Sequence, residues 1–174
     1  MTNCPFCGHE NIEGVDTCDE CQQPLADSHL HELGTAVERS LIDDRVDVLK
    51  PKAPIVVAGD KPVGQVLKLM VDKGIGCVII VDGETPMGIF SERDALMRLN
   101  TDYAAMADQP VSNVMTSPPQ TLVSDAKIAF ATHRMDLGGY RHLPVLGSAE
   151  ELVGIISVRD ILRYLTEKMT ASEA

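Results

Sequence analysis

The sequence predicts an α+β protein made of two similar halves, preceded by a small cysteine-rich segment. The stretch Gly88–Asp94, GIFSERD, reappears as Gly154–Asp160, GIISVRD, and each copy closes a unit of about sixty residues. Two Cys-x-x-Cys pairs stand ahead of the first unit. Two copies of one supersecondary unit can bury, in one joint core, apolar surface that neither copy could bury alone. We therefore expect two quasi-equivalent halves, and we expect their sites to form a related pair.

Composition limits the classes of function. The chain has 174 residues, enough for one ordinary domain with a small appendage, and a formal net charge of −11. That charge disfavours nonspecific binding to nucleic acid or to an anionic membrane. No apolar run approaches the roughly eighteen residues that span a bilayer. The N-terminus lacks the features of a signal peptide, so we expect a reducing, cytoplasmic location in which cysteines are metal ligands or free thiols.

Residues 1–24 have almost nothing apolar to bury. Each Cys-x-x-Cys pair can present two thiolates, and four thiolates satisfy tetrahedral zinc; the four cysteines are Cys4, Cys7, Cys18 and Cys21. The arrangement resembles a zinc ribbon of the rubredoxin-knuckle type, with Gly8 permitting the tight backbone after the first pair. Four ligands leave no open position for catalysis, so structural zinc is expected, with a redox dithiol as the alternative. We expect the ribbon to engage another protein.

A connecting helix is expected over residues 25–45, where apolar side chains recur at spacings of three and four: Leu30, Leu33, Val37 and Leu41. Such a stripe can dock on the main domain or pair with a second copy of the chain; docking is the simpler interpretation.

The first repeat, residues 46–100, reads strand–helix–strand–strand–helix. A strand at 55–57 precedes a helix with Asp60 as N-cap and Gly74 at its C-terminus. Strands at 76–81 and 87–90 follow, and a helix opens at Ser91. The second repeat, residues 114–170, follows the same plan displaced by 65 and later 66 residues, after a polar linker over 101–113.

This pattern resembles a tandem pair of CBS domains, together called a Bateman module. The motifs that carry the resemblance cover about residues 46–168; they are residues 76–82, 88–94, Val114-Met115-Thr116, 140–145 and 154–160. The resemblance implies two tandem β-α-β-β-α repeats and, commonly, association into a disc-like homodimer. The apolar outer helices that end in Met97 and Met169 agree with such a dimer.

Each repeat carries a Ser-x-x-Asp motif at the start of a helix. Without any ligand, this motif is a capping box that satisfies the free backbone donors of the first turn. The same helix N-terminus favours phosphate, and a carboxylate can accept from two vicinal hydroxyls. Resemblance to CBS pairs implies an adenine nucleotide. It assigns the ribose to Asp94 and Asp160, accompanied by Ser91 and Ser157, and the base to Ile55, Val56, Thr121 and Leu122; Arg93 and Arg159 are candidates for phosphate contacts or for solvated ion pairs.

The repeats differ where Arg141 and His142 correspond to Gly76 and Cys77. Arg offers a planar fork of donors for phosphate, and His adds another donor. We therefore expect one well-formed cleft and one that is weaker or vacant. Cys77 is expected to be a small apolar filler of a buried strand.

The leading hypothesis is a non-catalytic regulatory protein that binds an adenosine-containing ligand such as AMP, ADP or ATP, and that also binds structural zinc. An interaction scaffold with empty clefts is the alternative. An enzyme, including a redox protein using the Cys-x-x-Cys thiols, ranks last because no catalytic domain and no nucleophile–base pair accompany the repeat.

Overall fold

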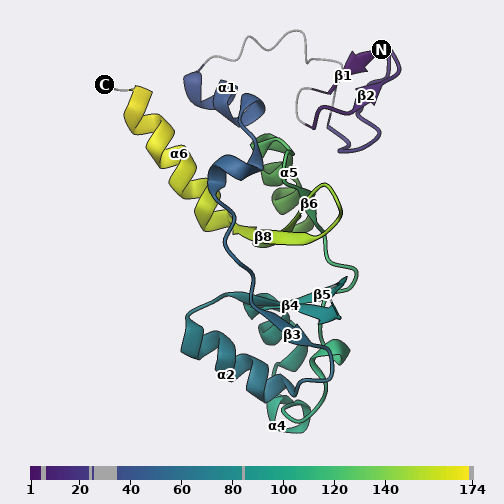
Figure 1. The fold of residues 1–174 in the computed structure, drawn as a ribbon, viewed down its shortest axis with the longest axis vertical. Coiled ribbons are helices and arrows are strands. Elements are labelled where there is room, and N and C mark those ends of the chain that lie inside the picture. The colour runs from purple at the N-terminus through teal and green to yellow at the C-terminus, as the bar shows by residue number, and fades with distance from the viewer. Residues whose placement is uncertain (5–6, 24, 26–34, 84, 173–174) are drawn as a thin grey trace. The chain divides into compact units, whose positions relative to one another are not determined.

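The computed structural model describes residues 1–4, 7–23, 25, 35–83 and 85–172. It divides into two compact units (Figure 1). The first unit contains residues 1–51, 122–143 and 156–174, and the second contains residues 52–121 and 144–155. Among the described helices, none combines the length and the apolar character that a membrane crossing requires.

The second unit holds a three-stranded sheet of order β3-β4-β5. Strand β3 (Val56–Ala58) runs parallel to β4 (Cys77–Asp82), which pairs antiparallel with β5 (Thr85–Ser91). Helix α2 (Val63–Lys73) forms the crossover between β3 and β4. Its apolar face packs on the sheet in one buried cluster that includes Val63, Val66, Met70, Val78, Ile80 and Phe90. The predicted strand–helix–strand–strand order is confirmed.

Helix α2 begins two residues later than predicted. Asp60 is not the N-cap; Pro62 takes that position without a side-chain hydrogen bond. The first free N–H groups are satisfied by backbone instead, with Val63 donating to Gln109 O at 2.9 Å and Gly64 donating to Ala107 O at 2.8 Å. A long-range backbone contact therefore replaces the local cap that the sequence indicated. At the other end, Gly74 has φ 61°, the left-handed conformation expected of a helix-ending glycine.

The second half of this repeat is short and irregular. Ser91 caps the helical turn α3 (Glu92–Asp94), which continues as the π-helical segment η2 (Ala95–Leu99). Helix α4 (Tyr103–Met106) and the 3-10 turn η3 (Val111–Asn113) follow in the linker.

The first unit contains the remaining helices. Helix α1 (Ala36–Asp43) and the 3-10 turn η1 (Val46–Leu49) precede the first repeat's strand β3, and α1 contacts α5 (Ile128–Gly138) and α6 (Val158–Ser172). The connecting helix predicted over residues 25–45 is shorter where the structure describes it: it begins at Ala36 after the N-cap Thr35 and ends at Asp43, and it is docked on α5 and α6. Leu30 and Leu33 lie outside the described residues. The second sheet has the order β6-β7-β8, formed by β6 (Leu122–Val123), β7 (His142–Leu146) and β8 (Leu152–Ser157).

The end of α1 is tied to α6 by polar contacts. Tyr164 donates its hydroxyl to Asp44 Oδ2 at 2.7 Å, and Lys168 Nζ lies 2.8 Å from the same oxygen. Hydrogen bonds from Lys168 and Tyr164 lower the pKa of the Asp44 carboxyl.

The turn that opens the first repeat and the turn at the end of the linker, just before the second repeat, occupy exchanged places. Val46 donates its N–H to Ala126 O at 2.8 Å in the first unit, and Val111 donates to Lys61 O at 2.9 Å in the second. Donor and acceptor correspond in both pairs, because 46 plus 65 is 111 and 61 plus 65 is 126. Both valines are fully buried. Each repeat thus supplies the turn that packs beside the first helix of the other repeat.

Candidate metal and nucleotide sites

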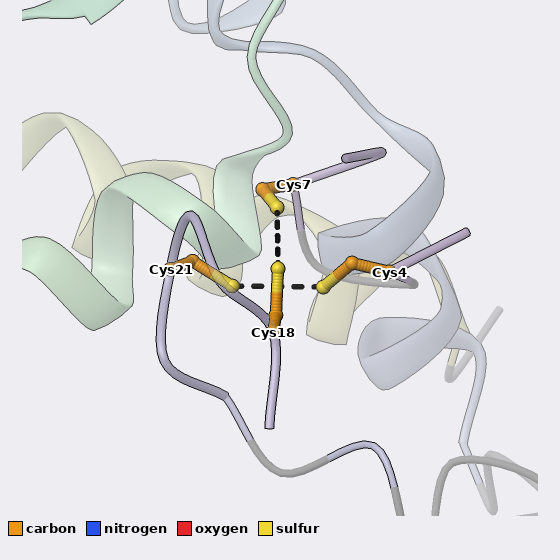
Figure 2. A group of neighbouring side chains, drawn as sticks. All are labelled: Cys4, Cys7, Cys18 and Cys21. Carbon is orange, nitrogen blue, oxygen red and sulfur yellow. Dashed lines mark hydrogen bonds between the residues drawn. The ribbon is translucent and has the colours of Figure 1, made fainter. Parts of the chain in front are cut away.

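The four cysteines of the ribbon converge on one point (Figure 2). Their sulfur atoms all lie within 4.8 Å of one another, with Cys4 and Cys21 at 3.5 Å and Cys7 and Cys18 at 3.6 Å. Zinc with Zn–S bonds of about 2.3 Å needs S–S edges of about 3.8 Å. These separations far exceed a disulfide bond of about 2.05 Å. The geometry therefore fits a four-thiolate metal site.

Two knuckles with the same backbone pattern present the cysteines. In the first, Gly8 donates its N–H to Cys4 O at 2.9 Å; in the second, Gln22 donates to Cys18 O at 2.8 Å. The φ angles of Gly8 and Gln22 are 78° and 59°, which confirms the tight backbone expected at Gly8. The same conformation at Gln22, a residue with a Cβ, was not predicted. A short hairpin of β1 (Thr2–Asn3) and β2 (Glu10–Asn11) connects to the knuckles.

Asn11, which is only 2% exposed, supports the cysteine site from behind by hydrogen bonds to the second knuckle. Its amide donates to Cys18 Sγ at 3.6 Å and accepts from the Asp19 N–H at 3.0 Å. Burial acts to raise the pKa of Cys18, but hydrogen bonds from the backbone of Cys21 and Glu20 and from Asn11 outweigh it, so that the pKa falls to about 6. Burial raises the pKa values of Cys7 and Cys21 instead, so in the absence of a metal the site favours a thiolate at Cys18 over those two. Sequence reasoning missed Asn11, because nothing in its local pattern marks it.

In the first repeat, the Ser-x-x-Asp motif forms a complete capping box. Ser91 donates its N–H and its hydroxyl to Asp94 Oδ2 at 2.9 and 2.6 Å, and Asp94 returns its N–H to the serine oxygen at 3.3 Å. The hydrogen bonds between Ser91 and Asp94 are therefore those of the ligand-free interpretation of this motif.

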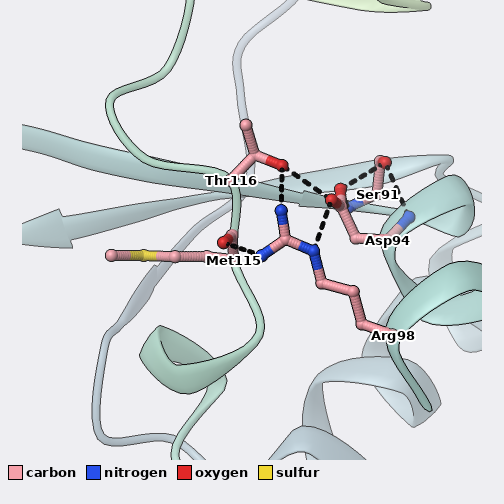
Figure 3. Close-up of polar contacts among 5 residues, drawn as sticks. All are labelled: Ser91, Asp94, Arg98, Met115 and Thr116. Atoms are coloured by element: carbon pink, nitrogen blue, oxygen red, sulfur yellow. Dashed lines mark hydrogen bonds and ion pairs between the residues drawn. The ribbon is translucent and has the colours of Figure 1, made fainter.

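The other oxygen of Asp94 is held by groups of the same unit (Figure 3). Thr116 donates its hydroxyl to Oδ1 at 2.7 Å, and Arg98 Nε lies 3.6 Å from that oxygen. Arg98 is anchored in turn by Thr116 Oγ1 at 3.1 Å and by the carbonyl of Met115. We call Arg98 and Thr116 the Asp94 clamp.

Gly88 makes the clamp sterically feasible. A Cβ at Gly88 would lie 2.4 Å from the sulfur of Met115 and 3.0 Å from the carbonyl oxygen of Thr116. The group that approaches this glycine closely is the chain's own segment at Met115 and Thr116. Ile89 and Thr116 exchange both backbone hydrogen bonds there, at 3.0 and 2.8 Å.

The second repeat builds a related site in the first unit. Ser157 donates its N–H and its hydroxyl to Asp160 Oδ2 at 2.8 and 2.6 Å, and Arg163 lies 3.3 Å from Oδ1. The N–H of Val158 donates to the carbonyl of Arg141 at 3.0 Å. Arg141 therefore lies at the N-terminus of α6, in the repeat that contains Asp160.

The first repeat has the equivalent bond with a different residue. Glu92 N–H donates to the carbonyl of Gly76 at 3.0 Å, so Gly76 stands where Arg141 stands in the second repeat. Asp160 is 6% exposed, and the Asp94 side chain is 12% exposed. The two carboxylates are thus similarly sheltered from solvent. They differ in the arginine that lies beside them, which is Arg98 for Asp94 and Arg163 for Asp160.

The remaining predicted residues occupy varied positions. Ile55 is half-buried before β3, and its carbonyl accepts the N–H of Ile79 at 2.9 Å. Thr121 and His142 are half-buried and Leu122 is buried, whereas the exposed candidates are Val56, Arg93, Arg141 and Arg159.

Cys77 belongs to an apolar cluster with Ile79 and Ile89, as predicted for a filler. Burial, helped by the charges of Glu92 and Asp94, raises the pKa of Cys77 to about 12. The thiol is therefore neutral at physiological pH.

Two quasi-equivalent repeats, each with a Ser-x-x-Asp motif at the start of a helix, define a tandem-repeat class of α+β protein. The CBS domain family profile matches residues 47–101 and 111–167, more than half of the chain. The chain belongs to the CBS domain family, as a tandem pair.

Curated relatives agree with this assignment. An uncharacterized 17.7 kDa protein of Acidianus ambivalens is 31% identical over 72% of this chain and 71% of its own length. The CBS domain-containing protein CBSCBSPB1 of Arabidopsis thaliana is 30% identical over 84% of this chain, and the match covers only 27% of that longer protein.

Solved structures show the same fold. The CBS-domain containing protein ATU1752 from Agrobacterium tumefaciens has a TM-score of 0.65 and 28% identity, covering 70% of this chain and 98% of its own. The CBS domain protein PAE2072 from Pyrobaculum aerophilum, complexed with AMP, has a TM-score of 0.62 and 22% identity, covering 74% and 99%. The CBS domain pair of protein MJ0100, in complex with 5'-methylthioadenosine and S-adenosyl-L-methionine, has a TM-score of 0.62 and 21% identity, covering 72% and 98%.

Proposed function

We propose that this chain is a non-catalytic sensor of an adenosine-containing ligand, with AMP, ADP and ATP as the leading candidates, and that its N-terminal ribbon holds structural zinc. The observation that carries the proposal is the Ser-Asp pair at a helix N-terminus in both repeats. The fold supports it, since two proteins with the same architecture have been crystallised with AMP or with S-adenosyl-L-methionine and 5'-methylthioadenosine.

In this proposal, Asp94 and Asp160 are the acceptors for the ribose hydroxyls. Each carboxylate is already oriented by its serine, so the ribose meets a pre-set acceptor. The helix N-terminus beside each pair favours the phosphate. Ile55, Val56, Thr121 and Leu122 are the proposed base-lining positions, and Arg93 and Arg159 add positive charge.

The site of the second repeat is proposed to bind the ligand more tightly. Arg141 lies at the N-terminus of α6, where the first repeat has Gly76, and it brings a guanidinium suited to phosphate. A ribose meets Thr116 and Arg98 at Asp94 and Arg163 at Asp160. The guanidinium of Arg141 is therefore the difference that favours the second repeat.

Titration calorimetry of the full chain with AMP, ADP and ATP tests the proposal. Wild type is expected to show one tighter site in the micromolar-to-millimolar range. Arg141→Gln, which removes the charge of an exposed side chain, should weaken that site about tenfold or more for ligands with phosphate and should leave adenosine binding nearly unchanged. Lys52→Gln, at an exposed position of the second unit, is the charge-matched control. Two equal sites in wild type would contradict the asymmetry, and no heat with any adenine nucleotide would contradict the function.

A ligand-free interaction scaffold is the second candidate. The observation that favours it is the Asp94 clamp, which satisfies the carboxylate without a ligand. Failure of every adenine nucleotide to raise the melting temperature of the zinc-loaded chain would support the scaffold, because a ligand specific to the folded state must stabilise it.

The outer helices are the proposed surface for a homodimer. Leu96 and Met97 of η2 are 77% and 74% exposed, and Leu162 and Met169 of α6 are both 56% exposed. Large apolar side chains exposed to this degree, taken within each unit by itself, mark candidate association surfaces. Sedimentation of wild type against Met97→Glu tests the proposal, and a monomeric wild type would contradict it.

A further inference from the structure

The second cysteine knuckle contacts α5 through both ring nitrogens of His133. His133 Nε2 lies 2.8 Å from the carbonyl oxygen of Cys21, and Nδ1 lies 2.6 Å from Nε2 of Gln23. A carbonyl oxygen can only accept, so Nε2–H donates to Cys21 and Nδ1 accepts from the amide of Gln23. A single imidazole tautomer therefore satisfies two groups of the knuckle at once.

The next residue of α5 adds a third contact to the same knuckle. Arg134 lies 3.5 Å from Glu20, and its guanidinium sits over the ring of Phe130 at 4.5 Å from the centroid. An ion pair this exposed contributes little by itself. The ring beneath the guanidinium restricts the arginine, so the ion pair adds a further contact between α5 and the knuckle.

The first repeat cannot make these contacts. Helix α2 is the counterpart of α5, and the positions 65 residues before His133 and Arg134 hold Lys68 and Leu69. An ammonium group has no acceptor for the amide of Gln23, and leucine has no charge for Glu20. Lys68 is instead paired with Asp72 on its own helix at 3.1 Å. The knuckle is therefore complementary to α5 and not to α2.

The contact involves one of the four clustered cysteines. Cys21 offers its sulfur to the cysteine cluster and its carbonyl to His133. The described residues of the ribbon bury Cys4, Cys18, Cys21 and Asn11 but no large apolar side chain before Leu25. A segment without an apolar core takes its folding free energy from the metal, so loss of the metal removes the shape that α5 recognises.

We propose that the zinc-loaded ribbon docks on α5 of the second repeat through His133, and that zinc binding and the stability of α5 are thereby coupled. The proposal rests on zinc binding by the four cysteines. The partner of the second knuckle is thus a helix of the same chain. By linkage, α5 must favour zinc binding by the same factor that zinc favours α5.

Hydrogen exchange measured by mass spectrometry tests the coupling in the full chain, with zinc and after chelation. Chelation is expected to speed exchange of the α5 amides about tenfold, within the usual range of coupling between sites. The amides of α2 serve as the internal control and should not change. His133→Ala should make α5 exchange the same with and without zinc, while the matched variant Lys68→Ala should behave as wild type.

Two further measurements separate the possible failures. His133→Gln keeps a donor and an acceptor and should restore part of the zinc dependence, which a merely unstable α5 would not show. Zinc is quantified in every variant by elemental analysis. Stoichiometric zinc with the same α5 exchange before and after chelation would overturn the docking alone. Absence of bound zinc in wild type would overturn the metal site and the docking with it.

Discussion

Thr116→Val tests the clamp that holds the first repeat's carboxylate. The substitution nearly preserves volume and removes the hydroxyl that donates to Asp94 Oδ1 at 2.7 Å. Removing a donor from a sheltered charged acceptor costs about 1.5–3 kcal/mol. Arg98 loses its bond to Thr116 Oγ1 but keeps its anchor on the Met115 carbonyl, so it can still pair with the carboxylate and the lower end applies. We expect the free energy of unfolding to fall by about 1.5 kcal/mol.

Urea denaturation measures this loss, and Ser117→Ala is the matched control. Ser117 donates its hydroxyl to the Met87 carbonyl at 2.8 Å in an exposed position, so its loss should cost less than about 0.5 kcal/mol. Equal losses for the two variants, or no loss for Thr116→Val, would refute the idea that the clamp stabilises a charged group.

The same substitution has an expected effect on ligand binding. If a ribose must displace Thr116, removing the hydroxyl should strengthen the weaker nucleotide site by up to about tenfold, since 1.4 kcal/mol is a factor of ten. Calorimetry with AMP on Thr116→Val and on the Ser117→Ala control measures the change. A weaker first-repeat site in Thr116→Val would show that the hydroxyl contacts the ligand instead of competing with it.

Three other substitutions probe the ribbon and the α1 connection. Asn11→Ala removes a hydrogen-bond donor to Cys18 and should weaken zinc affinity about 10- to 100-fold, measured by competition with a chromophoric chelator. Asn3→Ala, at an exposed position, should have no effect. Equal affinities for the two variants would contradict the support of Cys18 by Asn11. Gln22→Gly should tighten zinc binding in the same assay by up to about fivefold, because glycine adopts φ 59° without the roughly 1 kcal/mol cost of a Cβ. Weaker zinc binding by this variant would contradict the idea that the backbone at Gln22 is strained. The pKa of Asp44 is lowered by its hydrogen bonds, so its contribution to stability is complete above about pH 4 and is lost as pH falls through the depressed folded value. Asp44→Asn should therefore lose less stability than wild type as the pH falls from about 4 to about 2 in urea melts, and identical losses would contradict the assignment.

Local patterns sufficed where a residue's role depends on its neighbours in the chain. The repeated Gly-x-x-Ser-x-x-Asp predicted two related units, and the Ser91 capping box formed as its spacing indicated. The αL glycine at Gly74 and the knuckle at Gly8 followed from the same kind of local rule.

Long-range backbone contacts decided the features of the fold that local patterns did not predict. The start of α2 lies beyond Asp60 because the carbonyls of Gln109 and Ala107, far along the chain, satisfy its first N–H groups. The same applies to the exchanged turns around Val46 and Val111, whose partners belong to the other repeat.

The sequence by itself determined the duplicated architecture, the cysteine cluster and the Ser-Asp pairs, because periodicity, turn residues and ligand spacing are local properties of a chain. Only the tertiary structure showed that Thr116 and Arg98 clamp Asp94, and that Arg141 lies at the N-terminus of α6. It also placed His133, which reads as an ordinary helix residue, against the backbone of Cys21. Apart from the Arg98–Asp94 pair, which is four residues apart, these contacts join residues separated by 17 to 112 positions, and no pattern in a single sequence encodes a pairing over such distances.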